Sequence, residues 1–244
     1  MKKKSPAGVL ISGFLKSLCV ILLFVLTFFI SYKVSYYIQE TKGSSYDEVT
    51  DKIVSTIADQ DQKEPEVLRN VIYGVDELSG RIQAVVIENL DTKNETLDYR
   101  TVSTTRKLKL SNELYQKMLT VNEEVPQIVP LEDMMKYFQG STIYEYANTI
   151  LADQLGVDMT CYTTFSMEEF ERIFVYQDGG FQFTDDFTET MERLTDRDSI
   201  REYIYEIYSI ASSNFSRSMK CRYIDDYLKM DESTIRFTEG ESES

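Results

Sequence analysis

The 244-residue chain has no histidine and no tryptophan, and it contains only three cysteines and four prolines. Without histidine there is no Ser-His-Asp or Cys-His catalytic pair and no histidine-ligated zinc or haem. Cys19, Cys161 and Cys221 are too few and too scattered for a four-cysteine metal site or a dense disulfide scaffold. The nucleotide-binding loops G-x-G-x-x-G and G-x-x-x-x-G-K-[ST] are also missing, which excludes nucleotide sites of those kinds.

Basic residues are scarce relative to acidic ones. The chain has 26 Lys plus Arg against 41 Asp plus Glu, a formal net charge of −15. Every acidic residue lies at or after Glu40, so residues 34–244 hold 21 basic and 41 acidic side chains and carry a net charge of −20. Phosphate backbones need a basic face, so nucleic acid is excluded as a bulk partner. The excess of acid is typical of a surface that keeps an exported domain soluble.

A long apolar run follows the basic N-terminus. Residues 9–32 include an uncharged stretch, 18–30, and supply the roughly 20 positions that a membrane-spanning helix needs. More lysines precede this stretch than closely follow it, so the positive-inside rule predicts a cytoplasmic N-terminus and an extracellular remainder. We therefore expect a single-pass protein of the cell membrane, in contact with the lipid bilayer. The alternative is a cleaved signal peptide, but no small-x-small cleavage site follows the run.

Composition divides the chain into five parts. We expect a cytoplasmic tail at 1–8, a transmembrane signal anchor at 9–32, a polar stalk at 33–66, one extracytoplasmic domain at 67–237 and an acidic disordered tail at 238–244. A disulfide between Cys161 and Cys221 is compatible with an exterior location but is not required by the sequence.

Strand-like and helix-like patterns alternate through the exterior part. Buried or alternating apolar runs predict strands, and the spacing of apolar residues together with Ser/Thr capping signals predicts helices, the one at 142–154 opened by a capping box at Thr142. The expected strands are 71–74, 84–87, 97–101, 159–165 and 181–183; the expected helices are 111–120, 131–138, 142–154, one after Ser166, and two or three in the last 50 residues. This order predicts the α/β class, with a mixed β-sheet and helices on both faces.

Five short motifs also follow one another in an order found in a known family. They are Val71-Ile-Tyr-Gly-Val-Asp76, the strand from Arg81 to Asp91, Val102-Ser-Thr-Thr-Arg106-Lys107, the stretch 154–171 beginning Gln-Leu-Gly-Val, and Gly179-Gly180-Phe-Gln-Phe183. With the N-terminal anchor, this order resembles the LytR-CpsA-Psr family of bacterial cell-envelope proteins, in a divergent and truncated form. The match covers roughly residues 69–183.

The resemblance implies a fold, a reaction and partners. In that family one N-terminal span holds an extracytoplasmic α/β domain. The domain transfers wall teichoic acid or capsular glycopolymer from a polyprenyl-pyrophosphate carrier to peptidoglycan with the assistance of Mg²⁺. For this chain it implies a Gram-positive cell envelope and, as partners, a polyprenyl-phosphate-linked glycopolymer and peptidoglycan.

Several candidate site residues follow from the same motifs, although the sequence departs from the family at others. Asp76 corresponds to a Mg²⁺ ligand and catalytic carboxylate, Arg106 to a catalytic arginine, and Arg81 to the arginine that opens the second strand and contacts the ligand. Gln83 stands where the family has a second aspartate, and Lys107 stands where it has an acid. Read from the residues alone, Asp76 after Gly74 favours a turn over a metal ligand, and Arg106 is compatible with an ion pair to Asp or Glu as well as with a place facing a pocket.

Three downstream arginines complete the candidate set. Arg193, Arg197 and Arg201 lie where the family carries arginines that bind the pyrophosphate, in a segment shortened here by some twenty residues or more. Their spacing of four places all three on one face of a single expected helix, beside several acidic residues. A solvated helix face with i,i+4 ion pairs is the alternative to ligand binding.

These departures favour a protein that has kept the fold and carrier binding with weak or absent transferase activity. The 30 Tyr and Phe residues are typical of a core, and an apolar groove for a lipid tail would use the same residues. One alternative is a working phosphotransferase in which Asp185, Asp186 or Glu88 replaces the missing ligands. Another is a non-catalytic scaffold or regulatory subunit that binds a second membrane protein. A third is an unrelated α/β domain.

Overall fold

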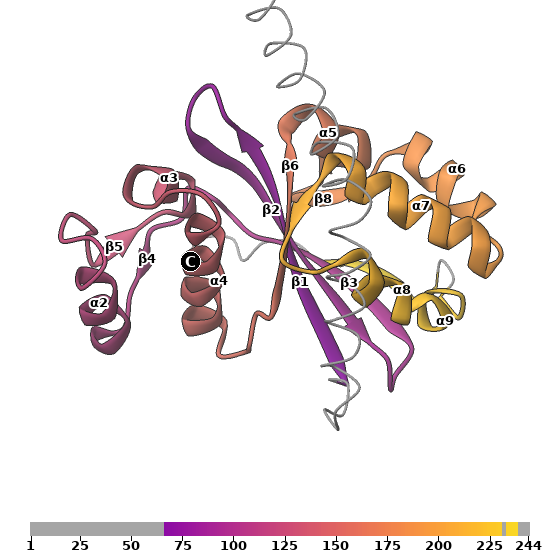
Figure 1. The fold of residues 1–244 in the computed structure, drawn as a ribbon, viewed down its shortest axis with the longest axis horizontal. Coiled ribbons are helices and arrows are strands. Elements are labelled where there is room, and N and C mark those ends of the chain that lie inside the picture. Colours follow the sequence, from indigo (N-terminus) through magenta and orange to yellow (C-terminus); the bar gives the residue numbers. More distant parts are fainter. Residues whose placement is uncertain (1–65, 231–232, 239–244) are drawn as a thin grey trace, which may run out of the picture. The chain divides into compact units, whose positions relative to one another are not determined.

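The computed structural model describes residues 66–230 and 233–238, which fall in the second of the chain's two units, Lys63–Ser244 (Figure 1). The predicted cytoplasmic tail, anchor and nearly all of the stalk lie outside the described residues, as do residues 239–244 of the acidic tail. Within the described part, no helix combines the length and apolar character that a membrane span requires.

A mixed six-stranded sheet forms the centre of the described unit. Its strands lie in the order β10-β3-β2-β1-β6-β9, and they are β1 (Val67–Asp76), β2 (Arg81–Asp91), β3 (Thr96–Thr101), β6 (Cys161–Ser166), β9 (Ser212–Ser213) and β10 (Ile235–Thr238). Pairs β1–β6 and β3–β10 are parallel, whereas β1–β2, β2–β3 and β6–β9 are antiparallel. The predicted α/β class and mixed sheet are confirmed. The short edge strands β9 and β10 were not predicted, and β10 ends at Thr238, where the predicted tail begins.

One face of the sheet is covered by the segment between β3 and β6 (Figure 1). This segment contains β4 (Leu108–Lys109), α2 (Asn112–Leu119), β5 (Ile128–Val129), a 3-10 turn η1 (Leu131–Asp133), α3 (Met134–Tyr137) and α4 (Thr142–Leu155). The helix predicted at 131–138 is thus split into two short pieces. The helix at 142–154 is confirmed, but its capping box is wrong: Ser141 is the N-cap, and the Thr142 hydroxyl donates to the carbonyl of Gln139 at 2.6 Å.

The opposite face is covered by the segments that follow β6 (Figure 1). They are α5 (Met167–Ile173), the hairpin of β7 (Phe174–Gln177) and β8 (Gly180–Phe183), α6 (Asp185–Arg193), α7 (Arg197–Ile210), α8 (Arg217–Arg222) and α9 (Ile224–Tyr227). Ser166 caps α5 as predicted, its hydroxyl accepting a hydrogen bond from the Glu169 amide at 3.3 Å. The helices predicted for the last 50 residues are confirmed as α7, α8 and α9.

Alternation along β1 and β2 divides the apolar side chains between the two faces. Val71 and Ile87 belong to the core against α2–α4, whereas Ile72, Ala84 and Val86 belong to the core against α5–α9. Both strands read as almost continuous apolar runs because the sheet is covered on both sides. Neither Cys161 nor Cys221 is in a disulfide in the structure.

α5 packs tightly against β1 at Gly74, beside a register shift in β1. A Cβ atom at this position would lie 2.8 Å from Sδ of Met167, 2.9 Å from Cγ of Phe170 and 3.0 Å from Cβ of Ala84. We therefore expect Gly74→Ala to lower the free energy of unfolding by about 1–3 kcal/mol through overpacking. Urea unfolding followed by circular dichroism measures this change. A variant as stable as the parent would contradict the close packing.

Candidate functional site

The carboxylate of Asp76 accepts hydrogen bonds within a turn. Asp76 ends β1, and its Oδ1 accepts hydrogen bonds from the amides of Leu78 at 3.0 Å and Ser79 at 3.3 Å. Its Oδ2 accepts a hydrogen bond from Nε2 of Gln83 at 2.9 Å. Hydrogen bonding to Ser79 lowers the pKa of Asp76, so the carboxylate is ionised at neutral pH. This geometry is that of a residue that closes the β1–β2 hairpin.

Arg81 and Arg106 lie on the same side of the sheet as η1 and α4. Arg81 is paired with Asp76 in the β1–β2 register, and its Nη1 lies 3.3 Å from Oε2 of Glu132. Arg106 is exposed in the loop after β3, where it lines a crevice of about 70 Å³ together with Arg100 and Gln154. The structure thus places Asp76 and Arg81 side by side, in the hairpin, and Arg106 in a separate loop.

These residues do not by themselves form a magnesium site. Mg²⁺ is usually held by one or two carboxylates with waters and substrate phosphates. Here the carboxylate of Asp76 already accepts three hydrogen bonds, and the neighbouring Gln83 is a donor to it. Among residues 66–230 and 233–238, no group of three His, Cys, Asp or Glu side chains is arranged to hold a metal ion. Mg²⁺ binding stays a prediction, and no chemical step is assigned to it.

The three downstream arginines do not share one helix. The predicted single helix is wrong, because the chain leaves the helical path after Arg193 and restarts at Arg197, with Asp196 as an N-cap that forms a capping box with Ser199. Each arginine pairs with an acid: Arg193 with Glu189 at 3.3 Å, Arg197 with Asp225, and Arg201 with Asp198 at 2.8 Å. All three side chains are about half exposed or more. They lie on the α6–α7 side of the sheet, on the face opposite to α4.

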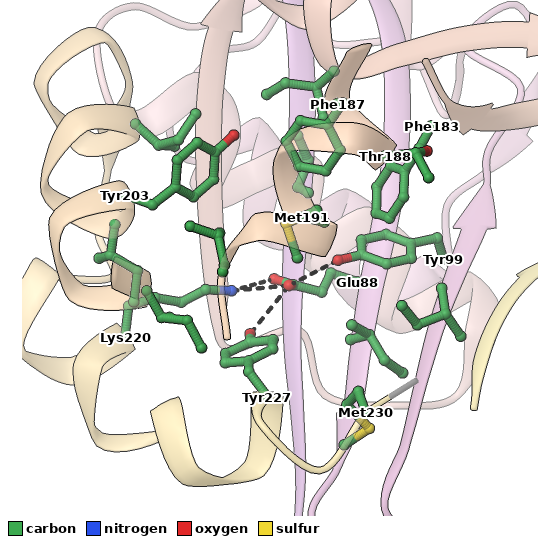
Figure 2. A pocket seen from close by; sticks show the side chains of 18 of the residues that line it. Glu88, Tyr99, Phe183, Phe187, Thr188, Met191, Tyr203, Lys220, Tyr227 and Met230 are labelled. Carbon is green, nitrogen blue, oxygen red and sulfur yellow. Dashed lines mark hydrogen bonds and ion pairs between the residues drawn. The ribbon is translucent and has the colours of Figure 1, made fainter. Parts of the chain in front are cut away.

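A cavity with a volume of about 600 Å³ lies between the sheet and α6–α9. Its walls are mostly aromatic and aliphatic (Figure 2). The aromatic lining residues are Tyr99, Phe165, Phe174, Phe183, Phe187, Tyr203, Tyr208 and Tyr227; the aliphatic ones are Ile72, Leu97, Ile173, Met191, Leu194, Ile200, Ile204, Ile207, Leu228, Met230 and Ile235. The polar lining residues are Asn70, Glu88, Thr163, Thr188, Glu192, Thr195 and Lys220. We call this cavity the apolar pocket.

A buried ion pair lies at the sheet side of the apolar pocket (Figure 2). Nζ of Lys220 in α8 lies 2.8 Å from Oε2 and 2.9 Å from Oε1 of Glu88 in β2, and their side chains are only 13% and 6% exposed. Glu88 also accepts hydrogen bonds from Asn70 at 3.1 Å, Tyr227 at 3.1 Å and Tyr99 at 3.3 Å. The ammonium of Lys220 lies 4.7 Å from the ring centroid of Tyr227. We call these five residues the polar floor.

The polar floor is electrically neutral as a whole. Burial raises the pKa of Glu88, but the charge of Lys220 and the hydrogen bonds from Lys220, Asn70 and Tyr227 oppose this, and the net shift is downward. Burial, reinforced by the charge of Glu88, raises the pKa of Tyr99 and of Tyr227 well above the usual value, so both phenols stay protonated. The floor therefore holds one carboxylate, one ammonium, one amide and two neutral hydroxyls under apolar walls.

Most of the polar floor was missed by the sequence motifs, which suggested Glu88 only as a substitute metal ligand. One signal was present: Glu88 interrupts the apolar run of β2, and an acidic residue in a strand buried on both faces needs a cationic partner. Its partner Lys220 lies 132 residues further along the chain, in a helix whose sequence gives no indication of the pairing.

The comparisons with known proteins concern the fold. No protein-family model and no curated protein matches the sequence. Among solved structures, TagV of Bacillus subtilis is similar with a TM-score of 0.49 and 9% identity, over 72% of this chain and 84% of that one. The structure described as TagT bound to LI-WTA is similar with a TM-score of 0.46 and 8% identity, over 74% of this chain and 81% of that one. TagU of B. subtilis is similar with a TM-score of 0.40 and 12% identity, over 72% of this chain and 84% of that one.

TagV, TagT and TagU are LytR-CpsA-Psr family proteins, the family whose motif order the sequence resembles. At these identities and TM-scores the likeness does not extend to the activity of this chain.

Proposed function

We propose that this protein binds the prenyl chain of a polyprenyl-(pyro)phosphate carrier in the apolar pocket, and takes part in attaching or handling a cell-envelope glycopolymer with weak or absent transferase activity. In this proposal the span at 9–32 anchors the protein, and the domain works at the outer face of the membrane of a Gram-positive bacterium. Peptidoglycan and the lipid-linked glycopolymer are the partners.

The apolar pocket is the observation that carries the proposal. Its volume of about 600 Å³ lies within the range of roughly 300–1,000 Å³ that buries most of a small ligand. Several of its apolar side chains, among them Phe183, Phe187 and Met191, are only partly buried although they face the interior. Apolar surface left uncovered inside a cleft favours a hydrocarbon ligand, since covering it is worth about 25 cal/mol per Å². A chain of isoprene units has the required shape and chemistry.

The surroundings of the candidate catalytic residues support weak or absent transfer. Phosphoryl transfer depends on preorganised positive charge and on metal ligands around the phosphates. Here Gln83 occupies the position of a carboxylate, Arg81 faces Glu132, and Arg193, Arg197 and Arg201 face acids. Losing a metal ligand at such a centre costs on the order of several kcal/mol of transition-state stabilisation, which is several decades of rate.

A single introduced tryptophan tests carrier binding, because the natural chain has none. Thr188 in α6 lines the apolar pocket, whereas Thr190, two positions further on, is absent from its lining. Both hydroxyls donate to the carbonyl four residues earlier, at 3.0 and 2.9 Å, so the two substitutions to tryptophan remove equivalent hydrogen bonds. We expect farnesyl pyrophosphate to give a saturable blue shift of the emission of the Thr188→Trp protein and no saturable change with Thr190→Trp.

The measurement uses the full-length protein held in an amphipol, because free detergent would compete for an apolar pocket. Equal responses from the two variants would indicate that farnesyl pyrophosphate partitions into the amphipol and does not enter the pocket. The absence of any saturable response from Thr188→Trp would contradict carrier binding and favour the scaffold alternative.

A further inference from the structure

A small crevice on the α4 side of the sheet combines cationic and aliphatic side chains. The residues that line it are Arg100, Thr101, Val102, Ser103, Arg106, Leu108, Leu151, Gln154 and Leu155. Among these described residues the charged ones are both arginines, whereas Leu108 and Leu151 are buried aliphatic residues. We call this site the arginine crevice, and we propose that it binds the carboxy-terminus of a peptide whose last residue has a small aliphatic side chain.

The arginine crevice is separate from the apolar pocket. Along β3, Tyr99 lines the apolar pocket and Arg100 lines the crevice, because successive side chains of a strand point to opposite faces of the sheet. Leu108 and Leu151 belong to the core against α2–α4, whereas Tyr99 belongs to the core against α5–α9. None of the described residues lines both sites. A lipid whose chain occupies the apolar pocket therefore does not fill the crevice, which suits a second ligand.

The charges around the arginine crevice favour an anion. The basic residues in the lining or next to it are Arg100, Arg106, Lys107 and Lys109, and the acidic ones are Asp98, Glu132 and Asp153. Each of the three acids accepts a hydrogen bond, in that order from Asn89 at 3.3 Å, from Arg81 at 3.3 Å and from the amide of Ser111 at 3.1 Å. Arg100 and Arg106 have contacts of their own, but the five N–H donors of a guanidinium allow a carboxylate as a further partner. The local balance is thus positive in a part of the chain whose net charge is −20, and it attracts a negative group.

Size and apolar surface narrow the choice of anion. The volume of about 70 Å³ is the share that roughly two water molecules have in the liquid, so the crevice encloses only a few non-hydrogen atoms. A carboxylate with the methyl group of an alanine meets this limit, whereas a pyrophosphate or a sugar ring exceeds it. The carboxylate matches the planar fork of an arginine, and the methyl group covers the aliphatic surface of Val102, Leu151 and Leu155. An inorganic phosphate has no apolar part to cover that surface.

Gln154 favours a peptide over a simple carboxylate ion. Its Nε2 donates a hydrogen bond to the carbonyl of Lys109 at 2.9 Å and lies 3.4 Å from Oδ2 of Asp153. The group that Gln154 offers to a ligand is therefore its side-chain oxygen, which only accepts hydrogen bonds. The N–H of the last peptide bond is a donor one residue away from the carboxylate, and it matches this oxygen. Acetate has no such donor.

Peptidoglycan offers a carboxy-terminus of this kind, because its stem peptides end in D-alanine. Capture of a terminal carboxylate is a recurring mode of peptide recognition. The site itself is inferred from its lining residues, and only the choice of peptidoglycan as the source of the peptide rests on the proposed function. In that setting the arginine crevice holds a peptide of the acceptor while the apolar pocket holds the prenyl chain of the carrier.

The test uses N-acetyl-D-alanyl-D-alanine as the probe and saturation-transfer difference NMR on the full-length protein in amphipol. We expect saturable signals from the terminal methyl group, and binding at least about fivefold weaker for the same peptide with its carboxylate amidated. Arg106→Gln should weaken binding of the free acid at least about fivefold. Lys107→Gln is the matched control: Lys107 is exposed in the same loop, lies outside the lining and loses the same charge. It should change the affinity by less than about twofold.

The outcomes also separate this proposal from carrier binding. Equal binding of the acid and its amide, or equal losses in Arg106→Gln and Lys107→Gln, would overturn the arginine crevice as a carboxylate site. Displacement of the peptide by an equal concentration of inorganic phosphate would overturn the preference for a peptide. No saturable signal at about 10 mM peptide would overturn the proposal as a whole. Peptide binding that depends on Arg106, together with no response of Thr188→Trp to farnesyl pyrophosphate, would support the crevice and contradict carrier binding.

Discussion

Lys220→Met is expected to lower the free energy of unfolding by about 3–5 kcal/mol at pH 7, because it leaves the carboxylate of Glu88 buried without its cation. The two side chains are 13% and 6% exposed, so solvent does little to compensate the remaining charge. Methionine keeps most of the volume of the lysine stem, so the loss reports the charge and not a cavity. Urea unfolding of the purified protein, followed by circular dichroism, measures the change.

The double variant Glu88→Gln/Lys220→Met is the control. It removes both charges while keeping a polar group that Tyr99, Tyr227 and Asn70 are able to contact. Replacing both members of a buried pair is far less costly than removing one, so the double variant should be more stable than Lys220→Met alone. A double variant as unstable as the single one would mean that Lys220 stabilises the fold through packing of its stem and not through Glu88.

The same pair predicts a dependence on pH. Because Lys220 and the hydrogen bonds lower the pKa of Glu88 below its unfolded value, the pair contributes stability that is fully present above the unfolded pKa and is lost as the pH falls through the folded one. In Lys220→Met the burial of Glu88 remains and the cation is gone, so the pKa of Glu88 should rise above the unfolded value. Acidification then protonates Glu88 in the variant, which removes the cost of burying an unpaired charge. The difference in stability between natural protein and variant should therefore narrow as the pH is lowered from 7 towards 5.

The parts of the fold that depend on local pattern were predictable from the sequence. The alternation of Leu97, Tyr99 and Thr101 gives β3 its buried face, as expected for a half-covered strand. The helix predicted at 111–120 is present as α2, and the Ser111 hydroxyl accepts a hydrogen bond from the Leu114 amide at 3.3 Å. The apolar run beginning at Ala84 lies in β2, buried on both faces. Each of these features is decided by a few neighbouring residues.

The parts that depend on distant contacts were not predictable in this way. β10 is stabilised as a strand by pairing in parallel with β3, and its four residues are too few to give a pattern of their own. The spacing of Arg193, Arg197 and Arg201 suits one continuous helix, but Asp196 accepts hydrogen bonds from the amides of Asp198 and Ser199 and begins a new one. A favourable charge spacing does not outweigh a strong N-cap.

The candidate site was even less predictable from local sequence patterns than the fold. The family motifs lead to Asp76, Arg81 and Arg106, which the structure places in the β1–β2 hairpin and in the loop after β3. The apolar pocket is built by side chains from all the long strands of the sheet and from β10, from α5 and the β7–β8 hairpin, and from the four helices α6–α9. No short motif contains such a set. The one signal in the sequence is Glu88, because a charged residue in an apolar strand indicates that a cationic partner lies next to it in the fold.

Phe170→Ala is expected to destabilise the fold by about 3–5 kcal/mol, because its ring is fully buried between α5 and the sheet. The ring centroid lies 5.0 Å from that of Phe174 and 5.1 Å from that of Phe181, so its removal leaves a cavity beneath the β7–β8 hairpin that rigid aromatic neighbours do not fill. Urea unfolding of the single variants and of Gly74→Ala/Phe170→Ala gives the coupling between the two positions. Since Cγ of Phe170 would lie 2.9 Å from a Cβ at position 74, Gly74→Ala should cost at least about 1 kcal/mol less once the ring is gone. Additive losses would mean that the close packing at Gly74 is set by Met167 and Ala84, and that α5 is held against β1 by contacts other than the Phe170 ring.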